Sequence, residues 1–382
     1  YIRLAFLFGD VPLVTTEISL DESKKQTRAP VSQVWDFISQ ELTEAADLLP
    51  KTQTDKGRIT KGAALAIKAR AMLYAGRYQD AVDAAQAVMD LNTYHLYSSY
   101  KNLFSYAAEN NPEVILDIQF IKDTYSNNAF ATLAPKSQNG NSIYVPTKNL
   151  VDAYEMSNGD SIGDAGSGFD PYNPYQDRDP RLLYSVFVPG DSLPNGGIFN
   201  PKPDSKTGDA VYSTFVVSPT GYNLKKYVNK EDLSIPGNCG INLILVRYAE
   251  VLLTYAEAKT ELNQVDASVY DAVNQVRQRP DVNMPAIATG KTQDEMRNII
   301  RHERMVELAF EGLRYFDILR WKIAEAVMPG KVYGMTYVDN GGNLQTVEVT
   351  GWTNLFNSRN YQWPIPQNEL DLNPQLTQNT GW

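Results

Sequence analysis

Two features of the sequence predict a mainly α-helical scaffold that carries a loop-rich face with short β-strands and hairpins. Apolar residues recur at helical spacing over long stretches near both ends of the chain. Between these stretches, residues 123–240 hold 11 of the 21 prolines and 12 of the 24 glycines, which favours turns and loops. With 382 residues, 43% of them hydrophobic, the chain is long enough to bury its own core.

The first helical region contains three amphipathic stretches. Apolar side chains follow a helical period over residues 31–49, and Pro50 ends that pattern. Residues 57–91 predict two helices that are joined by a tight turn at residues 75–78. The small residues of this pair have the spacing of a tetratricopeptide repeat, where they let antiparallel helices approach closely: Ala69, Gly76 and Ala81.

A second helical region begins at Asn242, continues through a helix that ends near Pro280, and finishes with a charged helix over residues 293–326. Three glutamates, spaced four apart, share one face of that last helix and alternate with arginines. This pattern is more typical of paired, partly buried charges than of the two carboxylates of a glycoside hydrolase. The glutamates are Glu303, Glu307 and Glu311.

Short strands are predicted within the loop-rich region, at residues 183–188 and 211–217, between clusters of turn residues. A hairpin is predicted in a C-terminal insertion, residues 332–362, around the turn signal Asp-Asn-Gly-Gly at 339–342. The charged run at 177–181 predicts a turn that contains internal ion pairs. We expect one compact unit with three parts, residues 1–122, 123–240 and 241–382.

Composition excludes several classes of function. The formal net charge of -10 argues against nucleic-acid binding, and the basic clusters are only the pairs Lys24-Lys25 and Lys225-Lys226. One cysteine, Cys239, and two histidines make disulfide and zinc chemistry unfavourable. No nucleophile motif is present, and no apolar run approaches the roughly 20 residues needed to cross a bilayer. We therefore expect neither catalytic residues nor a membrane-spanning segment.

No cofactor is predicted. Three aspartates of a glycine-rich stretch could in principle supply oxygen ligands to calcium, but their spacing differs from that of an EF-hand loop. Solvated turn residues are the better interpretation of Asp160, Asp164 and Asp170.

Several motifs follow one another along the chain: FGDVPLV at residues 8–14, the helix pair at 61–91, RDPR at 178–181, RYAEVLLTYAEA at 247–258, the charged helix at 300–321, WPIP at 363–366, and the dipeptides Asn373-Pro374 and Gln378-Asn379. In this order, they resemble the SusD/RagB-like family, nutrient-capture lipoproteins of the outer membrane in Bacteroidota. The resemblance covers nearly the whole chain and implies tetratricopeptide-like helix pairs that carry a variable ligand face.

The resemblance also implies a function. A family member captures starch-like or other oligosaccharides at the cell surface and passes them to a SusC-like TonB-dependent transporter. Its membrane attachment is an N-terminal lipid anchor, whose cysteine this sequence lacks. Residues 1–8 read as the middle of a helix with no signal peptide before them, so we expect an N-terminal portion to be missing.

Carbohydrate capture requires flat aromatic rings to stack on sugars and a few polar groups to bind hydroxyls, and loops can present both. The candidate ligand-binding residues are aromatic side chains of the loop-rich region and of the C-terminal insertion: Tyr172, Tyr175, Phe199, Tyr212, Tyr222 and Trp352.

Three alternatives remain open from the sequence. A peptide-capture protein of the RagB type would use the same fold with a deeper and more polar cavity. A tetratricopeptide adaptor would bind only another protein and would not need the long loop-rich region. A glycoside hydrolase is the most remote alternative.

Overall fold

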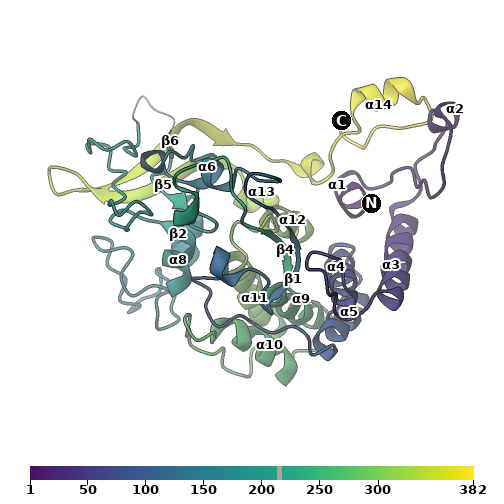
Figure 1. Ribbon diagram of the computed structural model, residues 1–382, viewed down its shortest axis with the longest axis horizontal. Coiled ribbons are helices and arrows are strands. Elements are labelled where there is room, and N and C mark those ends of the chain that lie inside the picture. Colours follow the sequence, from purple (N-terminus) through teal and green to yellow (C-terminus); the bar gives the residue numbers. More distant parts are fainter. Residues whose placement is uncertain (213–216) are drawn as a thin grey trace.

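The computed structural model describes residues 1–212 and 217–382. Helices gather around one end of the molecule, while the loop-rich segments surround a long β-hairpin at the other end (Figure 1). The main helices are α3 (Val31–Leu48), α4 (Lys61–Tyr74), α5 (Tyr78–Asp90), α9 (Tyr248–Glu261), α10 (Ala267–Arg277) and α11 (Gln293–Glu307). The mainly helical class predicted from the sequence is confirmed.

Helix α9 forms the centre of the scaffold. All of its residues except Glu261 are buried, and it contacts α4, α5, α10 and α11. Alanines such as Ala249, Ala256 and Ala258 give α9 a thin profile, which allows neighbouring helices to approach from several sides. This all-round burial explains why its apolar residues do not follow a single stripe. Its buried Glu250 and Glu257 are paired with Arg70 and Arg320.

The predicted pair of helices at residues 57–91 is confirmed as α4 and α5. Gly76 adopts φ 71° in the connecting turn, a left-handed conformation that glycine reaches without steric cost. The amide of Arg77 donates to the carbonyl of Met72, and the amide of Gly76 donates to Leu73, so the last carbonyls of α4 are satisfied. The three-residue connection returns the chain against α4 and fixes the pair as antiparallel.

The charged helix is shorter than predicted. Helix α11 ends at Glu307, and α12 (Arg314–Arg320) and α13 (Ala324–Val327) follow as separate short helices. Phe310 and Gly312 adopt φ angles of 62° and 79°, which a continuous α-helix cannot contain. Glu311 therefore lies outside α11, although its carboxylate still reaches Arg247, which is also a partner of Glu307.

Two further predictions of local structure were wrong, the second only in part. Residues 243–247 form strand β4 (Leu243–Arg247), not the start of a helix, because they pair antiparallel with β1 (Val114–Ile118). The predicted strand at 183–188 is wrong at residues 183–185, which belong to helix α8 (Pro180–Ser185), and is confirmed at β2 (Val186–Phe187), which pairs with β3 (Asn223–Leu224). The predicted strand at 211–217 falls largely outside the described residues.

The C-terminal hairpin is confirmed, with β5 (Gly330–Val338) and β6 (Leu344–Asn354) paired antiparallel. Asp339 closes its turn, since its amide donates to the carbonyl of Asn343 and its own carbonyl accepts from Gly342. The remaining helices are α1 (Ile2–Phe8), α2 (Leu20–Ser23), α6 (Ala129–Leu133), α7 (Lys148–Ala153) and α14 (Gln367–Leu372).

The two ends of the chain are bound to each other by polar side chains. Arg28 donates to the carbonyls of Phe8 and Thr377, at 3.1 and 2.8 Å. Asn379 donates to Phe8 and Trp363, at 3.0 and 2.7 Å. Figure 1 shows the terminal segments side by side at one corner. Residues of the C-terminal motifs therefore hold the N-terminal segment in place through hydrogen bonds.

A network of buried charges lies between the helical scaffold and the loop-rich region. The carboxylate of Glu307 accepts hydrogen bonds from Arg181, Arg247 and Arg279 at 2.9, 2.7 and 2.9 Å. Four further carboxylates complete the set, and all of these side chains are at least nine-tenths buried: Asp179, Glu113, Glu303 and Glu311. The interpretation of the glutamates as paired charges is confirmed.

The arginines hold these glutamates ionised. Burial alone raises the pKa of Glu307, but the guanidinium groups of Arg247, Arg279 and Arg181 outweigh burial and hold that pKa well below its ordinary value. The same balance lowers the pKa of Glu303, which lies beside Arg181 and Arg277, and the pKa of Glu311, which lies beside Arg247 and Lys226. None of these groups has the raised pKa that a general acid requires.

Replacing Glu307 with alanine should destabilise the fold by about 3 to 5 kcal/mol, because three buried guanidinium groups lose their common partner. Chemical denaturation at neutral pH measures the effect. The matched control is Glu41→Ala on the exposed face of α3, which we expect to change stability by less than about 0.5 kcal/mol. Equal stabilities for the two variants would contradict a structural role of the network.

Stability should also depend on pH in a defined direction. In the unfolded chain these glutamates titrate near about 4.3, whereas their pKa values in the folded protein are lower. Between these values the unfolded state binds more protons, so stability falls as pH falls. We expect the glutamate contribution to be complete above about pH 5 and to be lost progressively below about 4.3. Denaturation midpoints between pH 7 and 3 test this, and Glu307→Gln should flatten the slope.

Candidate functional site

A cavity of about 440 Å³ opens on the loop-rich face. Its walls come from three stretches that are distant in sequence: residues 171–176, residues 183–202 and the hairpin residues 336–344. We call it the tyrosine cavity, because the aromatic rings among its described lining residues are Tyr172, Tyr175 and Tyr337.

The three tyrosines differ in how firmly they are held. Tyr172 is 57% exposed, and its backbone amide donates to the carboxylate of Asp170 at 2.9 Å. Tyr175 is half-buried; its hydroxyl donates to that of Tyr222 at 3.3 Å, and the two rings meet edge to face. Tyr337 is half-buried on strand β5. Among the described lining residues, one exposed ring thus stands beside two half-buried rings.

Polar groups stand beside these rings. Asn173, Gln176, Asp191 and Lys202 all line the tyrosine cavity. Asp191 is paired with Lys225 at 3.1 Å, whereas Lys202 has no carboxylate within 4 Å in the part of the chain that the structure describes. Aromatic faces next to amide, carboxylate and ammonium groups suit a ligand that has both apolar faces and hydroxyls.

The structure brings together only two of the six aromatic residues that the sequence predicted. Tyr172 and Tyr175 line the tyrosine cavity, and Tyr222 lies behind Tyr175 with only 2% of its surface exposed. Phe199 is 0% exposed and packs against Phe187. Phe199 and Tyr222 are thus corrected from ligand contacts to packing residues, because neither buried ring offers a face for stacking.

The other two predicted residues lie on the surface, outside the lining of that cavity. Trp352 is 63% exposed on β6, and its indole N–H donates to Asn354 at 2.9 Å. Tyr212 is 59% exposed, and its hydroxyl donates to the carbonyl of Glu348 at 3.2 Å. Their part in ligand binding stays a prediction. Sequence reasoning missed Tyr337, although the hairpin signal beside it was available.

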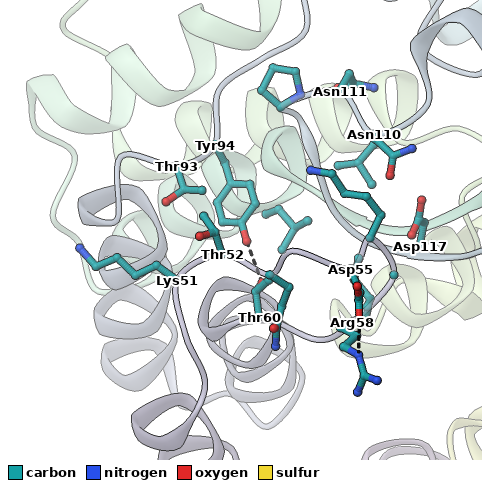
Figure 2. A pocket seen from close by; sticks show the side chains of 17 residues that line it. Lys51, Thr52, Asp55, Arg58, Thr60, Thr93, Tyr94, Asn110, Asn111 and Asp117 are labelled. Atoms are coloured by element: carbon teal, nitrogen blue, oxygen red, sulfur yellow. Dashed lines mark hydrogen bonds and ion pairs between the residues drawn. The ribbon is translucent and has the colours of Figure 1, made fainter.

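A smaller cavity, of about 190 Å³, lies on the helical side, between the loop after α3 and the segment that leads into β1. Figure 2 shows the hydroxyl of Tyr94 bonded to Thr60, at 2.9 Å, and Arg58 paired with Asp55, at 3.2 Å. Tyr94 supplies the aromatic ring of this lining, and the rest is chiefly polar. One ring in a smaller space suits stacking on a sugar chain less well than the tyrosine cavity does.

The three aspartates of the glycine-rich stretch stabilise turns. Asp170 accepts from the amide of Tyr172 and the side chain of Asn173, and these bonds lower its pKa. Asp164 accepts from the amide of Ser161, and Asp160 accepts from Asn158. Within residues 1–212 and 217–382, no group of three or more histidine, cysteine or acidic side chains is arranged to hold a metal ion. In the same residues, no helix is long and apolar enough to cross a membrane.

Comparisons with known proteins identify the family. Residues 112–382 match the model of the SusD family, and residues 1–73 match a second model, described as starch-binding associating with outer membrane. Because the first match covers more than half of the sequence, the chain belongs to the SusD family. The resemblance noted in the sequence is thereby confirmed.

The relatives agree with this assignment. A SusD-like protein of Formosa agariphila is 28% identical over 99% of this chain and 71% of its own length. A SusD-like carbohydrate binding protein of Bacteroides fragilis has a crystal structure that is 32% identical, with a TM-score of 0.89, over 98% of this chain and 77% of that one. A second SusD-like protein of that species is 27% identical, with a TM-score of 0.83, over 100% and 77% of the two chains.

Gly334 lets the hairpin wall of the tyrosine cavity pack closely. A Cβ at this position would lie 2.1 Å from the carbonyl oxygen of Thr220, and the next amide, that of Met335, donates to the same oxygen at 2.7 Å. Any side chain at residue 334 would therefore push β5 away from the segment beneath it.

The variant Gly334→Ala should lose about 1 to 3 kcal/mol of stability and displace the strand that carries Tyr337. Thermal unfolding, together with proteolysis of the hairpin, measures both effects. Gly237→Ala is the matched control, since a Cβ there meets nothing within 4 Å. Wild-type stability and protease resistance in Gly334→Ala would show that β5 does not need this close approach.

Proposed function

We propose that this protein is a non-catalytic, surface-exposed lipoprotein of the outer membrane that binds oligosaccharides at the tyrosine cavity and delivers them to a SusC-like TonB-dependent transporter. The observation that carries this proposal is the convergence of Tyr172, Tyr175 and Tyr337, from two distant segments, on one open cavity of about 440 Å³ in a SusD-family chain. Such rings can cover the apolar faces of sugar units, while the adjoining amides bind hydroxyls.

The family comparison supports the ligand class. The Bacteroides fragilis relative, 32% identical, is described as a carbohydrate binding protein. The model that matches residues 1–73 is described as starch-binding and associating with the outer membrane. Both descriptions favour a glycan over a peptide as the ligand of this chain.

The charges of the protein favour binding without chemistry. Glycoside hydrolysis commonly needs two accessible carboxyl groups, one of them with a raised pKa. Glu303 and Glu307 are 0% exposed and have lowered pKa values. The described lining of the tyrosine cavity contains one carboxylate, Asp191, which is paired with Lys225. One carboxylate that is already paired does not provide the two carboxyl groups that this reaction needs.

Replacing Tyr172 with alanine should weaken glycan binding about twofold to tenfold without loss of stability, because the ring is exposed and contributes chiefly a stacking face. Tyr144→Ala, a 60% exposed tyrosine outside the described lining of the cavity, is the matched control. Calorimetry and affinity electrophoresis against plant, microbial and mucin-type glycans measure affinity, and chromatography of the glycans detects any product.

Binding to a glycan class that is reduced in Tyr172→Ala but not in Tyr144→Ala, without product, is the expected result. Binding only to peptides in a parallel panel would replace the glycan proposal by peptide capture. Release of shortened glycans by the wild-type protein would contradict the absence of catalysis.

A further inference from the structure

A second cavity on the loop-rich face has an unusual charge. Its volume is about 370 Å³, and its described lining includes three lysines and neither aspartate nor glutamate. We call it the lysine cavity, after Lys101, Lys225 and Lys226. Although the chain has a net charge of -10, the charged side chains described around this cavity are all cations, which favours an anionic ligand group.

The three ammonium groups are engaged to different degrees. Lys226 is buried, and its ammonium group already donates hydrogen bonds to Glu311 and to the carbonyl of Ala309, both at 2.8 Å. Lys225 is half-buried, and its ammonium group forms an ion pair with Asp191 at 3.1 Å. Lys101 is exposed and has no carboxylate within 4 Å in the described part of the chain. The cavity therefore offers one available ammonium and one that is partly neutralised.

Lys101 is held in place through its backbone. Its amide donates to the carboxylate of Asp281 at 3.0 Å, and the amide of Tyr100 donates to the same carboxylate at 2.9 Å. The segment is thus fixed, while the side chain of Lys101 remains free to reach a ligand. Two half-buried tyrosines, Tyr184 and Tyr227, provide rings in the same lining.

The lysine cavity adjoins the tyrosine cavity. Leu183 lines both of them. The ion pair between Asp191 and Lys225 joins a lining residue of the tyrosine cavity to a lining residue of the lysine cavity. One ligand chain that lies across Leu183 can therefore occupy both cavities at once.

We propose that the lysine cavity is a subsite for a sugar unit that carries an anionic substituent, a carboxylate or a sulfate ester, within the same oligosaccharide whose neighbouring units stack in the tyrosine cavity. This inference rests on the proposed function. Lys101 supplies the main charge and Lys225 the second, while the rings of Tyr184 and Tyr227 face the sugar. Because the whole chain is acidic, the ligand carries isolated anionic groups rather than a charge on every unit.

Matched pairs of oligosaccharides test the proposal. One pair is a glucuronic-acid-substituted xylo-oligosaccharide and its carboxyl-reduced form; the other is a sulfated galacto-oligosaccharide and its desulfated form. Calorimetry at low and high salt gives the preference for the anionic member of each pair. We expect preference for the anionic member in at least one pair, weakened by salt.

Variants locate the preference. Lys101→Ala should reduce it about twofold to fivefold while leaving affinity for the neutral member unchanged. Lys101→Arg should retain it. The matched control is Lys56→Ala, an exposed lysine of the helical-side cavity whose loss changes the net charge equally. Tyr172→Ala should weaken binding of both members of a pair.

The outcomes separate the two proposals. Equal affinity for both members of every pair, or a parallel loss of both in Lys101→Ala, overturns the anionic subsite. If Tyr172→Ala still weakens neutral binding in that case, glycan capture stands. If no pair is bound and no neutral glycan of the wider panel is bound either, both proposals fail.

Discussion

The interaction on which the rest of this structure depends is the set of hydrogen bonds around the carboxylate of Glu307. Its three guanidinium partners come from separate parts of the chain: Arg181 from α8, Arg247 from the end of β4, and Arg279 from the segment after α10. Burying charges costs several kcal/mol per ion, so such a cluster is tolerated only when every member is paired in good geometry. The need for complete pairing therefore favours one position of the loop-rich region on the helical scaffold. In the observed position of the loop-rich region, Arg181 reaches two carboxylates of α11, Glu303 and Glu307.

The positions of the residues that line the tyrosine cavity depend on this docking. Helix α8, which Arg181 anchors, contains Leu183 and leads directly into Val188 and Asp191, and these residues form one wall of the tyrosine cavity. The neighbouring loop is fixed by Arg178, which donates to the carbonyls of Val151, Tyr154 and Pro174. The loops can therefore vary in sequence at their tips while their bases stay in place. A rigid scaffold beneath adaptable loops is a common solution when binding residues must be positioned but ligands differ.

Periodicity and turn chemistry are local properties, so the helix pair α4 and α5 and the β5–β6 hairpin could be predicted from the sequence. Strand β4 could not, because its apolar run suits a helix equally well and its partner β1 lies more than 100 residues away. The end of α11 could not be predicted either. The left-handed turn at Phe310 brings Glu311 to Arg247 and Lys226, and these contacts join residues that are distant in sequence. In the loop-rich region, burial of Phe199 and Tyr222 depends on how segments stack, which composition does not encode. The place of Tyr337 in the cavity depends on residues 171–176 and 183–202, which are distant in sequence, so the local hairpin signal does not indicate it.

The positioning of the rings explains why such a site suits a chain of sugars better than a single unit. Tyr175 is held by Tyr222, so stacking on it costs little conformational entropy, but only part of its face is open. Tyr172 offers more surface, yet immobilising an exposed side chain costs about 0.5 to 1.5 kcal/mol, which is similar to the gain expected from one stacking contact. Each ring therefore adds little net affinity by itself. A ligand that contacts several rings loses the entropy of association only once, while the small free-energy gains of the individual rings add up. The cavity should therefore bind longer oligosaccharides more tightly than single sugars.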